Sequence, residues 1–211
     1  MAQRERTFMD VLETLVPYFA DRYEITLTAP TISWTRGGYQ GPKTRYRPGE
    51  RVVSVREEFS YSYPEVVSRL SYHLGEQAVD ENTPLGEWQT DGTDDRLLFE
   101  TTNEVAREFQ REGLTHVLRS ADDVDPLDRA SLYARAAWNG AIGALAASAP
   151  SGLAYRRPLR ANGIDVAEFF RRPRETYVDL LEWRRTGAAS LLGLWRTAHA
   201  GICAPSALAG A

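Results

Sequence analysis

Basic and aromatic side chains alternate along residues 34–56. Guanidinium groups neutralise phosphates and aromatic rings stack on nucleobases, so this composition suits single-stranded nucleic acid or another phosphate backbone. The alternative is an ordinary hairpin whose exposed face carries arginine and tyrosine, both common there. The candidate binding residues of this segment are Trp34, Arg36, Tyr39, Lys43, Arg45, Tyr46, Arg47 and Arg56.

A second basic group follows in the C-terminal half. Arg156, Arg157 and Arg160 lie in a predicted loop, ahead of further arginines on either side of Pro173. Arginines beside a helix start can hold a phosphate or an acidic partner. The alternative is that they cap helices and cover solvated faces. Their first candidate partner is the acidic 78–95 loop of another copy, which would make a homo-oligomer.

Glu57 and His73 are the candidates for acid–base or metal chemistry. Strict alternation along the predicted strand at 51–61 puts Glu57 on the apolar face, where burial raises a carboxyl pKa unless the group is paired. His73 follows across the next turn. A bulge at Glu57, or an arginine partner such as Arg56 or Arg69, removes this anomaly without any catalytic role.

Known reaction motifs are missing from the sequence. It contains no phosphate-binding loop, dinucleotide glycine fingerprint, nucleophile elbow or zinc-protease helix. One cysteine excludes a disulfide framework and multi-cysteine zinc sites, and three histidines leave little for a histidine-rich metal centre. We therefore expect no metal and no cofactor, and the sequence favours a non-catalytic protein.

Charge is distributed unevenly along the chain. The net charge is −4, yet residues 31–56 carry +5, residues 57–104 carry −10 and residues 156–211 carry +4. All but one of the 25 basic residues are arginine, a planar bidentate donor, although nucleotide bias in a GC-rich genome would produce the same excess. The basic segments are typical of local polyanion binding, or they face the acidic middle of the chain.

The elements that must position these residues are read from periodicity. A helix is predicted at 7–23, with a kink or break at Pro17. Alternation predicts strands at 24–34 and 51–61, joined by a loop rich in glycine and proline. Ser62 and Glu65 form a capping box that opens a helix ending at Gly75, and a helix from Thr101 is predicted to stop at Gly113.

The C-terminal half is predicted to be largely helical. Helices are expected at 125–149, 165–171 and 173–200. The predicted fold class is α+β, with a small antiparallel sheet in the N-terminal half packed on helices. We expect one domain over residues 1–200 and a flexible tail rich in alanine and glycine at 201–211.

The N-terminus begins with charged residues and the longest uncharged run, 136–155, is mostly alanine and glycine. We therefore expect neither export nor membrane insertion, and a cytoplasmic location. The leading hypothesis is a non-catalytic binding or assembly protein that engages nucleic acid or an acidic protein partner. The alternatives are a small enzyme with a site around Glu57 and His73, and a structural subunit of a homo-oligomeric or virion-like assembly.

Overall fold

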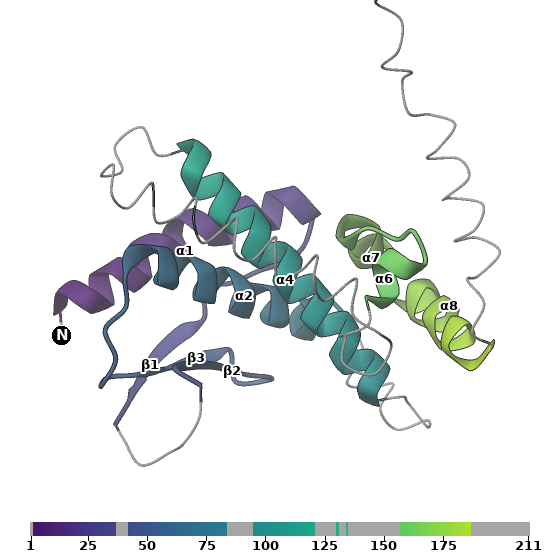
Figure 1. Cartoon of the computed structure of the whole chain (residues 1–211), viewed down its shortest axis with the longest axis horizontal. Coiled ribbons are helices and arrows are strands. Elements are labelled where there is room, and N and C mark those ends of the chain that lie inside the picture. Colours follow the sequence, from purple (N-terminus) through teal and green to yellow (C-terminus); the bar gives the residue numbers. More distant parts are fainter. Residues whose placement is uncertain are drawn as a thin grey trace, which may run out of the picture.

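Helices and a small sheet form an α+β fold in the computed structural model, which describes residues 2–36, 42–83, 95–120, 130, 134 and 157–186 (Figure 1). The fold class predicted from the sequence is confirmed. The elements, in chain order, are α1 (Ala2–Tyr23), β1 (Thr31–Thr35), β2 (Thr44–Arg47), β3 (Val52–Arg56), α2 (Tyr63–Asn82), α4 (Asp95–Ser120), α6 (Pro158–Ala161), α7 (Val166–Arg171) and α8 (Pro173–Thr186).

The three strands have the order β1-β3-β2, and the sheet is mixed. β2 runs antiparallel to β3, whereas β1 pairs with β3 in parallel. The prediction of a purely antiparallel sheet was therefore wrong, because alternation does not encode strand direction. Strand β2 lies within the segment that was predicted to be a loop. After β2 the chain turns back toward β3 through Pro48 and Gly49, and Gly49 has a φ of +75°. Strand β2 occupies the antiparallel position beside β3, so β1 pairs on the other side.

One face of the sheet packs on α1 and α2, and in Figure 1 none of the labelled helices lies on the opposite side. We call these the inner and the outer face. Phe8 of α1 meets Trp34 of β1 edge-to-face, with the ring centroids 5.4 Å apart. Strand alternation places Tyr46, Val53 and Val55 inside as well, where all three are buried.

Helices α2 and α4 share the largest helix–helix interface among the described elements. The predicted ends at Gly75 and Gly113 were wrong, because both helices continue through these glycines. A Cβ added to Gly75 would lie 2.6 Å from Ala106 Cα, and one added to Gly113 would lie 2.1 Å from Ser71 Oγ. These glycines allow the close approach of two helices and end neither of them.

The first helix confirms its sequence pattern. Phe8, Leu12, Leu15 and Phe19 are buried, while Pro17 is exposed and the helix continues past it to Tyr23. The start of α2 is confirmed too, since the Ser62 backbone N–H donates to Glu65 Oε2 at 3.3 Å. Capping and periodicity act over a few residues, which is why these features were readable from sequence.

The C-terminal helices attach to α1 and α4 through aromatic rings. Phe170 of α7 lies 6.1 Å from Tyr23 and 6.2 Å from Phe109, measured between ring centroids. The start of α7 was predicted correctly, and Asp165 Oδ1 accepts the Glu168 N–H at 2.7 Å. Of the helix predicted at 125–149, only residues 130 and 134 are described, and both are helical. The predicted tail at 201–211 and the end of the last predicted helix lie outside the described residues.

None of the described helices combines the length and the apolar character that crossing a membrane requires.

Candidate anion-binding face

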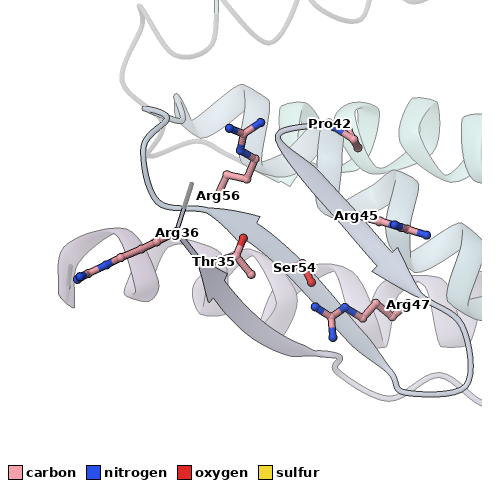
Figure 2. A pocket seen from close by; sticks show the side chains of 7 residues that line it. All are labelled: Thr35, Arg36, Pro42, Arg45, Arg47, Ser54 and Arg56. Atoms are coloured by element: carbon pink, nitrogen blue, oxygen red, sulfur yellow. The ribbon is translucent and has the colours of Figure 1, made fainter. Parts of the chain in front are cut away.

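The outer face of the sheet gathers four arginines around an open depression of about 250 Å³. Arg45 and Arg47 come from β2 and Arg56 from β3, because alternation turns these residues away from the core. Arg36 follows the last residue of β1. Figure 2 shows the depression and the side chains around it, which are Thr35, Arg36, Pro42, Arg45, Arg47, Ser54 and Arg56.

Three of these arginines contact nearby carboxylates. Arg36 Nε lies 2.8 Å from Glu57 Oε2, and Arg47 Nη1 lies 3.3 Å from Glu50 Oε2. Arg56 pairs with Glu58 across the turn that ends β3. The hydrogen bond to Glu57 raises the pKa of Arg36 above its usual value. Exposed pairs of this kind contribute about 0–1 kcal/mol, so an incoming anion can displace the carboxylates.

Arg45 is different from its neighbours. Its side chain is exposed, and it has no hydrogen-bond or salt-bridge partner among the described residues. In Figure 2 it extends outward from β2, as Arg36 does from β1, while the Arg47 guanidinium points across the sheet toward Ser54. The structure thus brings together four of the predicted binding residues on one surface.

The two described aromatic members of the predicted set, Trp34 and Tyr46, do not share this surface. Trp34 packs inward against Phe8, and Tyr46 is 5% exposed and donates its hydroxyl to Asp80 Oδ2 at 2.8 Å. Tyr39 lies outside the described residues. Lys43 is half-buried and pairs with Glu65 at 3.3 Å. Strand pleating separates basic from aromatic residues that alternate in sequence.

Glu57 is not forced inward. Strand β3 ends at Arg56, so the alternation that predicted a buried carboxyl stops one residue earlier. The Glu57 side chain is 25% exposed and pairs with Arg36. An arginine partner for Glu57 was the structural alternative considered at the sequence level, and the partner is Arg36, which comes from the end of β1.

His73 lies in a buried hydrogen-bond chain. Its Nε2 is 2.8 Å from Thr44 Oγ1 and its Nδ1 is 2.7 Å from Glu76 Oε2, so α2 is tied to β2. Hydroxyl, imidazole and carboxylate occur in this order in hydrolase triads. Here Thr44 is 5% exposed and His73 7% exposed, and neither lines the depression on the outer face. The hydrogen-bond chain therefore joins the sheet to α2.

The second basic group is partly described. Arg156 lies outside the described residues, while Arg157 is the N-cap of α6 and Arg160 lies in its last turn. There the Glu104 carboxylate of α4 accepts the backbone N–H groups of Leu159 and Arg160 at 2.9 and 3.1 Å. Burial raises the pKa of Glu104 to about 7, although both N–H groups and the two arginines oppose that shift. A carboxylate of the same chain thus occupies the start of α6, within the segment that was predicted to be a loop.

Sequence reasoning missed the hydroxyl floor of the depression. Thr35 and Ser54 lie between the arginines, and Ser54 Oγ has no hydrogen-bond partner among the described residues. The signal for Ser54 was the alternation of residues 52–56, which places it on the same face of β3 as Arg56. No group of three or more histidine, cysteine or acidic side chains within the described ranges is arranged to hold a metal ion.

Comparisons with known proteins return no family model, no curated protein and no solved structure that matches this chain.

Proposed function

We propose that this chain is a non-catalytic binding protein that holds a polyanionic macromolecule on the outer face of its sheet. The observation that carries the proposal is the set of Arg36, Arg45, Arg47 and Arg56 around one open depression. Such a surface neutralises negative charge without needing any group that transfers protons or electrons. The overall charge of −4 does not oppose it, because association depends on the local field at the binding surface.

Binding of a nucleic acid to this surface should weaken steeply as the salt concentration rises. Each neutralised phosphate contributes about 0.7 to the slope of log affinity against log salt for single strands and about 0.9 for duplexes. With all four arginines engaged, a fourfold rise in salt lowers affinity about 50-fold for a single strand and about 150-fold for a duplex. Removing two contacts reduces these losses to about 7-fold and 12-fold.

The experiment measures binding of a labelled mixed-sequence oligonucleotide by fluorescence anisotropy at several salt concentrations. The wild type is compared with Arg45→Ala/Arg47→Ala, which removes two exposed charges from β2. The matched control is Arg6→Ala/Arg22→Ala, which removes two exposed charges on α1, a helix that packs on the inner face of the sheet. We expect the salt slope to fall by about 1.4–1.8 in the β2 variant and to stay unchanged in the control.

Two results would overturn the proposal. The first is the absence of binding at low salt by folded wild-type protein to both the oligonucleotide and an acidic polypeptide. The second is an equal loss in the β2 variant and its control, because overall charge alone would then explain the binding. Circular dichroism and the urea midpoint of each variant verify that the fold is retained.

A further inference from the structure

We infer that the outer face recognises a nucleic acid through its phosphate groups, and that the bases make no contribution to affinity. This inference rests on the proposed function and names the chemical group that the surface binds. It departs from the sequence-level hypothesis, in which aromatic rings stack on bases beside the arginines.

The positions of the rings exclude the expected stacking platform in the described part of the face. Trp34 packs against Phe8 on the inner face, and Tyr46 is buried with its hydroxyl bonded to Asp80. Single-strand-binding surfaces that use bases need rings whose faces are open to solvent. Trp34 and Tyr46, the two predicted aromatic residues that lie in strands, therefore face the inner side of the sheet, away from the arginines.

Phe59 is a half-buried ring that lies near one corner of the arginine surface. Arg56 Cζ lies 4.8 Å from its centroid, and Lys43 Nζ lies 5.2 Å from the same centroid. Cations at these distances interact with the π face that a base would otherwise occupy. Phe59 consequently orients Arg56 and Lys43, and we assign it no stacking role.

The chemical groups that remain on the outer face are guanidinium and hydroxyl. Both types donate hydrogen bonds to phosphate oxygens, which accept most protein–nucleic acid hydrogen bonds. Ser54 is opposite Arg45 in the strand register, and the Arg47 guanidinium points toward it (Figure 2). The sheet therefore offers two guanidinium groups beside one hydroxyl donor.

Ser54 supplies an observation that is independent of charge. Its Oγ is shielded from solvent by its neighbours and has no hydrogen-bond partner among the described residues. Buried polar atoms are nearly always satisfied, so this hydroxyl is available to donate a hydrogen bond to a ligand in the depression. The Arg47 side chain is 47% exposed and points toward Ser54, so it can turn toward a phosphate that this hydroxyl also reaches.

The first test compares three probes with wild-type protein in the same anisotropy assay. They are a mixed single strand of about 20 nucleotides, longer than the roughly 4–16 that one single-strand-binding fold covers, an abasic phosphodiester of the same length, and polyglutamate of equal charge. We expect the abasic strand to bind within about twofold of the mixed strand, since each stacked base would otherwise contribute about 5- to 150-fold. We expect polyglutamate to bind at least about tenfold more weakly, because each of its carboxylates lies on a flexible side chain whose ordering costs conformational entropy, whereas a phosphate belongs to the backbone of its polymer.

Two probe results would overturn the inference while leaving the proposed function intact. Much weaker binding of the abasic strand would show that bases are read. Equal binding of polyglutamate would show that the face takes any polyanion, an acidic protein included. Failure of every probe to bind would instead remove the proposed function, so the two failures are distinguishable.

The second test uses matched variants. Ser54→Ala should weaken binding of the abasic strand by roughly tenfold, the lower range for a hydrogen bond to a charged group. Ser33→Ala is the control, because Ser33 lies opposite Ser54 in the strand register but does not line the depression. Equal affinities of these two variants would overturn the assignment of Ser54.

The aromatic variants address bases directly. Phe59→Leu and Tyr39→Ala should each leave the ratio of mixed-strand to abasic-strand affinity unchanged. A variant that lowers this ratio by about fivefold or more would identify a stacking ring and overturn the inference. The ratio is insensitive to losses that affect both probes equally, such as a small displacement of Arg56.

Discussion

Substituting Gly75 by alanine tests the close packing of α2 against α4. Alanine ordinarily stabilises a helix interior by about 1 kcal/mol relative to glycine. Here the added Cβ would lie 2.6 Å from Ala106 Cα and 3.1 Å from Phe109 Cβ. Ala106 Cα belongs to the backbone, so rotation of a side chain cannot relieve the contact and the helices must separate. Overpacking costs about 1–3 kcal/mol, and we take the upper part of that range.

We therefore expect Gly75→Ala to lower the free energy of unfolding by about 1–2 kcal/mol, the overpacking cost less the gain in helix propensity. With a slope near 2 kcal/mol/M, the urea midpoint should fall by about 0.5–1 M. The comparison is Gly113→Ala, where the nearest atom is Ser71 Oγ at 2.1 Å, a side-chain atom. Ser71→Ala should partly rescue Gly113→Ala and leave Gly75→Ala unrescued. A midpoint equal to or above that of wild type for Gly75→Ala would refute the close approach of the helices.

Two further predictions concern buried polar groups. The pKa of Glu104, raised by burial from 4.5 to about 7, means that the folded chain favours the protonated carboxyl. Its contribution to stability is therefore complete below pH 4.5 and is lost as the pH rises through 7. The difference in unfolding free energy between wild type and Glu104→Gln should change by about 3 kcal/mol from pH 4.5 to 8. If the unfolding free energies of the two proteins instead varied with pH in the same way, the prediction would be contradicted. Thr44→Val leaves His73 Nε2 without its hydroxyl partner at 2.8 Å. We expect this variant to lower the free energy of unfolding in urea by about 1–3 kcal/mol. An unchanged free energy of unfolding would mean that this hydrogen bond does not stabilise the contact between β2 and α2.

Local sequence determined the apolar face of α1 and the starts of α2 and α7. The predicted helix starts at Thr7 and Thr101 were wrong, because α1 begins at Ala2 and α4 begins at Asp95. The apolar spacing of Phe8, Leu12, Leu15 and Phe19 predicted the buried face of α1. The capping residues Ser62 and Asp165 predicted the starts of α2 and α7. Each of these signals depends on groups within about one helical turn, whose geometry is set by the backbone itself. Such signals can be read before any tertiary contact is known.

The ends of helices and the direction of strands depended on tertiary contacts. Gly75 and Gly113 are typical helix-ending residues in isolation, yet each lies where the neighbouring helix leaves no room for a side chain. The strand pattern of residues 31–35 is the same for parallel and antiparallel pairing. In the folded sheet β2 occupies one edge of β3, and β1 pairs in parallel along the other edge. Competition between distant segments leaves no mark on local periodicity.

In the candidate site, too, some features follow from the sequence and others only from the tertiary structure. The sequence alone determined that arginine is concentrated in residues 34–56, and composition was sufficient to predict a basic segment. Only the tertiary structure decided which residues of that segment share a surface: Arg45, Arg47 and Arg56 lie outside, while Trp34 and Tyr46 pack inside. The reason is physical, because the pleat of a strand assigns neighbours to opposite faces, but packing on α1 and α2 decides which face becomes the core.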